Sequence, residues 1–350
     1  MKIVEGKRRA SVLGLVKFVA AVAIVYFHTL LGKPEHFSTL YLLVELFFFI
    51  TGYYTFKHFQ DRSVSILNDD IDTKAKKALK YTGRKIRSLA PYILVAIIMH
   101  YTILLIPVVG NGRHAIFDII KGLPFDLLLL NTQAGITNWP MWFVSAMVIV
   151  MPFFCLLCQS KNKHVLFVFS SLACLIYYFN FYRWPYGHGV FYIAPLIRAF
   201  MGMLMGVNIY AVADKLSKVE ITKVQRVLLQ IGEIGVLILS FVLMYSRDNS
   251  TNVSTFRSLA ILSFFVYLCI FMSGKTIASK ISSPTMDFLE KISMVVFMIH
   301  IPILNVVYML NMGCRATAVI ICGSIIASIA VFCMVEYVRL CRSSVNKQLR

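Results

Sequence analysis

Runs of apolar residues, each about 20 long, recur from one end of the chain to the other and are separated by short polar segments. A helix of about 20 residues crosses the roughly 30 Å hydrocarbon core of a bilayer. A lipid-exposed segment must satisfy its own backbone polar groups, and the alternation of a membrane β-barrel is missing from these runs, so they predict helices. We expect about ten transmembrane helices, over residues 12–31, 39–56, 88–108, 139–158, 165–181, 190–210, 227–245, 258–273, 292–312 and 316–338.

Composition agrees with this pattern. Of the 350 residues, 59% are hydrophobic and 15% are charged, whereas a soluble domain carries roughly 25% charged residues. The first run follows Lys7-Arg8-Arg9, as a signal peptide would. It is too long for the apolar core of a signal peptide, and no small-residue cleavage site follows it, so we interpret it as a retained first helix. The sequence therefore predicts an all-α polytopic membrane protein, with residues 1–350 forming a single transmembrane domain and no separate soluble domain.

Lysines and arginines are distributed unevenly between the loops. A net charge of +19 is also typical of nucleic-acid-binding proteins, but here most charges lie in short loops, which favours a lipid bilayer over nucleic acid as the partner. If the N-terminus is cytoplasmic, the inside segments carry 26 Lys and Arg and the outside segments carry seven. This bias predicts that both termini are cytoplasmic.

Two connecting segments need separate interpretation. Residues 109–138 contain an apolar stretch that is too short to span and is interrupted by glycine and proline, so we expect an outside loop with an interfacial or re-entrant piece. Residues 61–87 form most of the largest inside loop, and a basic helix is expected there, beginning near Asp69-Asp70. The eight cysteines lie in or near apolar runs. Even the CxxC pair Cys155 and Cys158 has no second pair nearby, so neither a metal site nor a disulfide framework is predicted.

Ionisable residues inside the membrane are costly, and each is therefore a functional hypothesis. Lys17 and His28, on the first predicted helix, are eleven residues apart. That spacing is three turns plus about 20°, so both side chains share one face, about 16 Å apart along the axis. The alternatives are a snorkelling anchor for Lys17 and a packed interfacial histidine for His28.

Glu45 lies on the second predicted helix at a depth similar to that of His28, because only residues 32–38 connect the two helices. A buried carboxylate beside an imidazole fixes its tautomer and makes it a competent general base. We therefore predict a Glu45–His28 pair, with a purely structural polar pair as the alternative. His300 precedes Pro302, which is expected to bend the helix; packing at a kink is the alternative for that histidine.

The remaining polar and aromatic candidates are less distinctive. His100, Arg198 and Glu336 complete the intramembrane ionisable residues, and for His100 and Glu336 packing or boundary roles suffice. Aromatic residues gather around Trp142 and in the outer loop that contains Tyr182. Both groups fit either a membrane aromatic belt or a platform for a sugar ring.

Five segments occur together in an order that covers nearly the whole chain. They are a Lys and a His separated by ten residues in the first helix, Glu45-Leu-Phe-Phe-Phe-Ile-Thr-Gly52, Arg84-Lys-Ile-Arg87 followed by Pro91, Trp142-Phe-Val-Ser145, and Ser293-Met-Val-Val-Phe-Met-Ile-His300. Together they resemble acyltransferase family 3, the inner-membrane acyltransferases that O-acylate bacterial surface sugars. Two positions depart from the family pattern. Lys17 stands where the family has Arg, which keeps the charge but loses the guanidinium fork, and Met147 stands where many members have Glu.

The resemblance implies an O-acyltransferase that uses acetyl-CoA or another acyl-CoA as donor, no metal, and a sugar or polysaccharide as acceptor. Lys17, Arg84, Lys85 and Arg87 are the donor-binding candidates, because cationic side chains form charge-assisted bonds with phosphates. His28 and Glu45 are the catalytic candidates, with His28 acting either as general base or as an acyl-imidazole carrier. The substrate-binding candidates are Trp142, Ser145, Tyr182, Arg198 and His300.

Two other classes of protein remain open at this point. A transporter or flippase could use intramembrane His, Glu and Lys as a proton relay, although no internal repeat of the kind common in transporters is detectable. A structural membrane subunit is the third possibility, but it would leave the alignment of Lys17, His28 and Glu45 without explanation.

Overall fold

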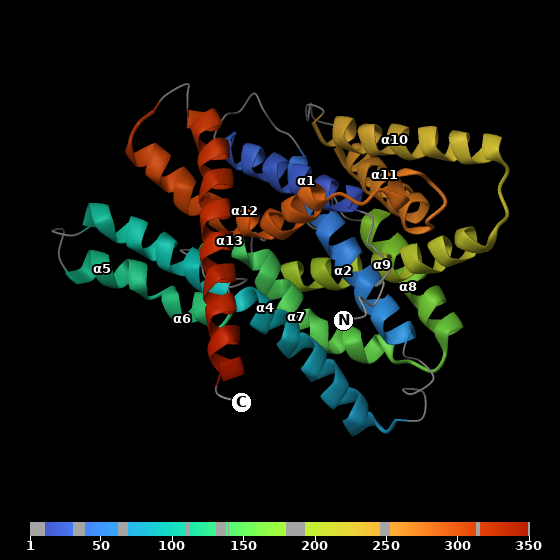
Figure 1. The fold of residues 1–350 in the computed structure, drawn as a ribbon, viewed down its shortest axis with the longest axis horizontal. Helices are drawn as coiled ribbons and strands as arrows, with labels where there is room; N and C mark the ends of the chain where they lie inside the picture. Colours follow the sequence, from blue (N-terminus) through green and yellow to red (C-terminus); the bar gives the residue numbers. More distant parts are fainter. Residues whose placement is uncertain are drawn as a thin grey trace.

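The computed structural model describes residues 11–30, 39–61, 69–108, 113–130, 138, 140–179, 193–245, 253–312 and 316–348. The described part of the chain is all-helical and contains no strand (Figure 1). The longer helices are α1 (Val12–Thr29), α2 (Leu43–Gln60), α4 (Ile71–Leu105), α7 (Met141–Cys158), α8 (Lys163–Phe179), α9 (Ala194–Lys218), α10 (Lys223–Tyr245), α11 (Val253–Met272), α12 (Pro284–Met309) and α13 (Ala316–Gln348). The shorter elements are η1 (Leu40–Leu42), η2 (Ile106–Val108), α5 (Arg113–Ile120), α6 (Leu123–Leu127) and η4 (Ala278–Lys280).

Within the described residues, eight helices are long and apolar enough to cross a membrane. Each overlaps one of the predicted spans. Two further predicted spans, 165–181 and 258–273, correspond to the shorter apolar helices Lys163–Tyr178 and Arg257–Met272. The described residues therefore form a multi-pass helical bundle that includes eight candidate spanning helices.

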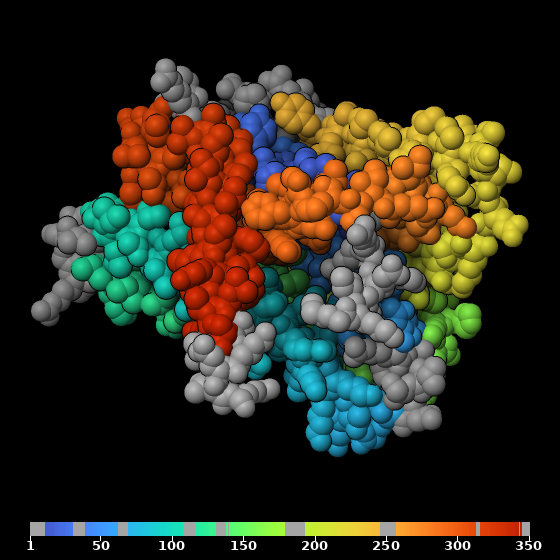
Figure 2. Space-filling view, in the orientation of Figure 1, coloured from blue at the N-terminus to red at the C-terminus, as the bar shows by residue number. Residues whose placement is uncertain are grey.

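Helix α4 joins two segments that the sequence separates. The expected basic helix and the expected span 88–108 are one continuous helix of 35 residues. At 1.5 Å per residue it is about 52 Å long, much longer than the hydrocarbon core is thick. It begins at Asp70, whose carboxylate accepts a hydrogen bond from the Thr73 N–H at 3.0 Å. Hydrogen bonding to Thr73 also lowers the pKa of Asp70. Figure 2 shows the start of α4, in light blue, projecting from the lower edge of the molecule.

The segment predicted as a non-spanning outer loop contains α5 and α6, which have 8 and 5 residues. Neither is long enough to cross a bilayer. Both contact α4, at the left of Figure 1. Asp126 of α6 is fully buried and accepts a hydrogen bond from the Tyr101 hydroxyl at 2.9 Å.

Helix α2 is the most enclosed of the candidate spanning helices, and it packs tightly against α9. A Cβ atom at Gly52 would lie 2.1 Å from the carbonyl oxygen of Met203, and a Cβ atom at Gly206 would lie 2.4 Å from that of Phe49. Only glycine allows two helix backbones to approach this closely, as is common between membrane helices. This contact fixes how α2 is turned about its own axis.

Candidate active site

Polar contacts connect α1 and α12 at three levels. The Ser11 hydroxyl donates to Asp287 Oδ1 at 2.6 Å, and Lys17 Nζ lies 2.6 Å from Glu290 Oε1. At the far end of α1, His28 Nδ1 lies 2.7 Å from His300 Nε2. Because the partners advance in the same direction along both helices, α1 and α12 run parallel. We call this set of contacts the α1–α12 seam.

The seam is closely packed between its polar contacts. A Cβ atom at Gly14 would lie 2.7 Å from Glu290 Cβ and 2.8 Å from the Met286 carbonyl oxygen. Ala20 and Ala21, between Lys17 and His28, are completely buried. Side chains larger than glycine would not fit at position 14 of this interface without displacing α12.

His28 and His300 form the C-terminal end of the seam. His300 is fully buried within α12, whereas His28 is half-buried in the last turn of α1. The two rings are nearly parallel, with an interplanar angle of 11° and centroids 4.8 Å apart. His300 Nδ1 lies 2.9 Å from the carbonyl oxygen of Phe297. His300, which the sequence suggested as a substrate contact, is thus the direct neighbour of the predicted base.

The predicted Glu45–His28 pair does not form. Glu45 is fully buried and accepts hydrogen bonds from Arg198 Nε and, at 3.1 Å, from the Tyr178 hydroxyl. A Cβ atom at Gly202 would lie 3.3 Å from Glu45 Oε2, which shows that the carboxylate lies against α9. The prediction rested on equal depth in the membrane. It was wrong because the tight α2–α9 contact places the Glu45 carboxylate against α9, where Arg198 and Tyr178 bind it.

Arg198 is the counter-ion of Glu45. Its guanidinium also donates from Nη2 to the Tyr41 carbonyl at 3.3 Å. The guanidinium carbon lies 5.1 Å from the centroid of the Trp142 ring and 5.8 Å from that of Tyr41, within the range of cation–π attraction. Trp142 is half-buried, and its contact with Arg198 makes it part of the cluster around Glu45. Ser145, one turn further along α7, is completely buried.

Lys17 has a partner that the sequence reasoning missed. Its side chain is 17% exposed and pairs with Glu290, which is 25% exposed. The spacing along the chain held a signal for this pair, because Glu290 precedes His300 by ten residues and Lys17 precedes His28 by eleven. Lys17 therefore has a counter-ion within the protein, and its role in donor binding stays a prediction.

The three other donor-binding candidates, Arg84, Lys85 and Arg87, are exposed on α4. Lys85 Nζ lies 5.7 Å from the centroid of the Tyr81 ring. Tyr182, a predicted sugar contact, lies outside the described residues. Glu336 accepts hydrogen bonds from the Tyr92 hydroxyl at 3.0 Å and from Arg339 at 2.6 Å, in keeping with a boundary role.

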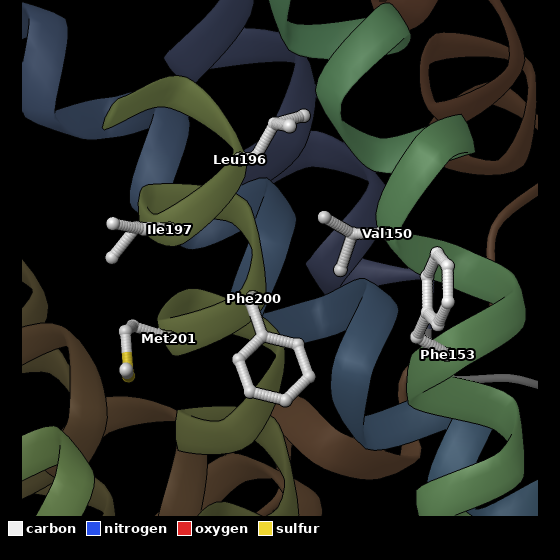
Figure 3. A pocket seen from close by; sticks show the side chains of 6 residues that line it. All are labelled: Val150, Phe153, Leu196, Ile197, Phe200 and Met201. Carbon is white, nitrogen blue, oxygen red and sulfur yellow. The ribbon is translucent and has the colours of Figure 1, made fainter. Parts of the chain in front are cut away.

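An apolar pocket of about 270 Å³ lies between α7 and α9 (Figure 3). It is lined by Val150, Phe153, Leu196, Ile197, Phe200 and Met201. None of these side chains can exchange a proton or hold an ion, so the pocket offers no chemistry of its own. Among the described residues, no group of three or more His, Cys, Asp or Glu side chains is placed to hold a metal ion.

A family model described as an acyltransferase domain, Acyl_transf_3, matches residues 12–336. The chain belongs to this acyltransferase family. The matched range includes the Lys17–Glu290 and His28–His300 contacts of the α1–α12 seam, the Glu45–Arg198 pair and the basic start of α4. No curated protein and no solved structure matches the chain. The family and the apolar helices together identify a multi-pass membrane acyltransferase.

Proposed function

We propose that this protein transfers an acyl group, most simply acetyl, from cytoplasmic acyl-CoA to a hydroxyl of a cell-surface or lipid-linked polysaccharide, in the bacterial inner membrane. The observation that carries the proposal is the His28–His300 contact at 2.7 Å, in a half-buried position at the end of α1. An imidazole is the side chain best suited to general acid–base work near neutral pH.

The donor would bind through its phosphates to Arg84, Lys85 and Arg87. Two observations support these three residues as the donor site: they are exposed, and they precede the part of α4 that is predicted to cross the membrane. Helix α4 is longer than the hydrocarbon core is thick, so part of it must extend beyond the core. Guanidinium groups form bidentate, charge-assisted bonds with phosphate. Anionic lipid headgroups offer the same chemistry, so binding of the donor itself has to be measured.

The acyl transfer requires one proton to move twice. His28 takes the proton of the acceptor hydroxyl while the hydroxyl oxygen attacks the thioester carbon. The new C–O bond forms and the C–S bond breaks. The proton then passes from His28 to the departing CoA thiolate. Alternatively, His28 attacks first and carries the acyl group as an acyl-imidazole. Trp142, held against Arg198, is half-buried and is the aromatic surface proposed to contact a sugar ring.

The test uses purified protein in lipid nanodiscs with radiolabelled acetyl-CoA and envelope glycan from cells that lack the gene. We expect wild-type protein to release CoA and to label the glycan. His28→Ala should lower transfer by about 10²-fold or more while the protein still inserts. His164→Ala, an exposed histidine at the start of α8, is the matched control and should leave transfer unchanged. Wild-type labelling by His28→Ala would disprove the proposal, and uptake of glycan without acyl transfer would indicate a transporter.

A further inference from the structure

The neighbours of His300 determine which of its ring nitrogens carries a proton. Nδ1 lies 2.9 Å from the carbonyl oxygen of Phe297. A carbonyl oxygen can only accept a hydrogen bond, so Nδ1 must donate. A neutral imidazole has a single N–H. In neutral His300, therefore, Nε2 carries the lone pair and can only accept.

The same reasoning extends to His28. Its Nδ1 lies 2.7 Å from His300 Nε2. Since His300 Nε2 accepts, His28 Nδ1 must donate. The lone pair of neutral His28 is then on Nε2. The hydrogen bonds thus form one directed chain, in which His28 Nδ1–H donates to His300 Nε2 and His300 Nδ1–H donates to the Phe297 carbonyl.

We propose that His300 is a positioning residue that holds His28 in the Nδ1–H tautomer, so that Nε2 of His28 is the atom that receives the proton of the acceptor hydroxyl. This rests on the proposed function, in which His28 is the base. The proton moves from the hydroxyl to Nε2 and later from Nε2 to the CoA thiolate. His300 keeps its own proton on Nδ1, which donates to the Phe297 carbonyl throughout, and its Nε2 contributes only a hydrogen-bond acceptor to His28.

A second imidazole suits this position for an electrostatic reason. In many enzymes a carboxylate orients the catalytic histidine. His300 is fully buried inside a candidate membrane-spanning helix, where an unpaired carboxylate would be costly. A neutral imidazole, itself oriented by a backbone carbonyl, fixes the tautomer without adding a charge. Glu45 is not available for this role because its carboxylate is held by Arg198 and Tyr178.

Two variants of His300 separate hydrogen-bond acceptance from packing. Gln places an amide oxygen where Nε2 of His300 lies, so His300→Gln can still accept from His28 Nδ1–H. Phe has a ring of similar size but no acceptor, so His300→Phe retains the packing and loses the bond. A purely structural histidine would tolerate Phe at least as well as Gln.

The test combines NMR of ¹⁵N-histidine-labelled protein in nanodiscs with steady-state kinetics. The His28 signals, assigned by their loss in His28→Ala, should show a proton on Nδ1 and none on Nε2 in the wild type and in His300→Gln. In His300→Phe the proton should move to Nε2. We expect kcat within about tenfold of wild type for His300→Gln and about 10²-fold lower or more for His300→Phe, with little change in KM for acyl-CoA.

Several results would overturn the inference. A wild-type spectrum with the proton on Nε2 of His28 decides against it, whether or not His300→Phe can be purified. Equal loss of kcat in both variants would show that His300 supplies something other than an acceptor. Failure of the proposed function gives a different pattern, in which the tautomer is as inferred but His28→Ala remains active.

Discussion

Lys17 of α1 lies 2.6 Å from Glu290 of α12, and His28, eleven residues further along α1, meets His300 of the same partner helix. The ion pair and the histidine pair are therefore two points of attachment between two parallel helices. Because helices packed in close contact cannot slide without losing such contacts, the ion pair helps to set the level at which His28 faces His300.

Exchanging the charges of Lys17 and Glu290 distinguishes this role from direct binding of the donor. Lys17→Glu and Glu290→Lys should each lower kcat, because two like charges would then face each other. The double variant should recover most of the loss, with a coupling energy of about 0.5–3 kcal/mol, as found for residues in contact. The measurement is kcat and KM for acyl-CoA in all four proteins. If Lys17 instead binds the phosphates of CoA, the double variant will keep a high KM and show no recovery.

Glu45 and Arg198 form a buried ion pair, and removing one partner should be worse than removing both. Arg198→Met leaves the Glu45 carboxylate buried without its cation, a change that typically costs about 3–5 kcal/mol. The double variant Glu45→Leu/Arg198→Met removes both charges and should unfold at a higher temperature than Arg198→Met alone. Thermal unfolding followed by gel filtration measures this order. A double variant less stable than Arg198→Met would refute the prediction.

The close α2–α9 contact predicts a strong difference between two glycines. Gly52→Ala would place a methyl group 2.1 Å from the Met203 carbonyl oxygen, so the helices must separate. Such overpacking costs about 1–3 kcal/mol. The matched control is Gly235→Ala, an exposed helical glycine with no atom within 4 Å of the added methyl. It should be neutral or stabilising by up to about 1 kcal/mol, because Ala favours helix.

Thermal unfolding midpoints of Gly52→Ala and Gly235→Ala measure this difference in stability directly. Since the Gly52 contact also orients Glu45 toward Arg198, Gly52→Ala should lose acyl transfer together with stability. Equal midpoints for the two variants would show that α2 and α9 do not approach as closely as described.

The exposed arginines on α4 are expected to bind the acyl-CoA donor and to have no part in the chemical step. Arg84→Ala and Arg87→Ala should each raise KM for acyl-CoA about tenfold, because a hydrogen bond to a charged group contributes about 1.5–3 kcal/mol, and kcat should change little. The control is Lys76→Ala, another exposed cation on the same helix. A KM raised equally by Lys76→Ala would indicate a diffuse electrostatic surface in place of a phosphate site. Raised ionic strength should weaken donor binding in the wild type.

Several properties of this protein follow from the sequence alone. Lipid forces each apolar run to satisfy its own backbone hydrogen bonds, so the runs become helices wherever the structure describes them, and residues 113–130 form short helices that cannot span. An ionisable side chain within the membrane is costly and therefore rare, so each one stands out in the sequence. Lys17, His28, Glu45 and His300 are therefore identifiable from the sequence alone, and their segments resemble the acyltransferase family to which the chain belongs.

The tertiary structure alone decided which of these residues meet. Hydropathy gives the depth of a residue in the bilayer but not the direction in which it points around its helix. That direction depends on packing between segments far apart in the chain. The close packing of Gly52 against Met203 orients Glu45 toward Arg198. The α1–α12 seam places His300 beside His28. The candidate base was thus predictable, whereas its partner was not, because a partner is chosen by helix rotation and not by depth.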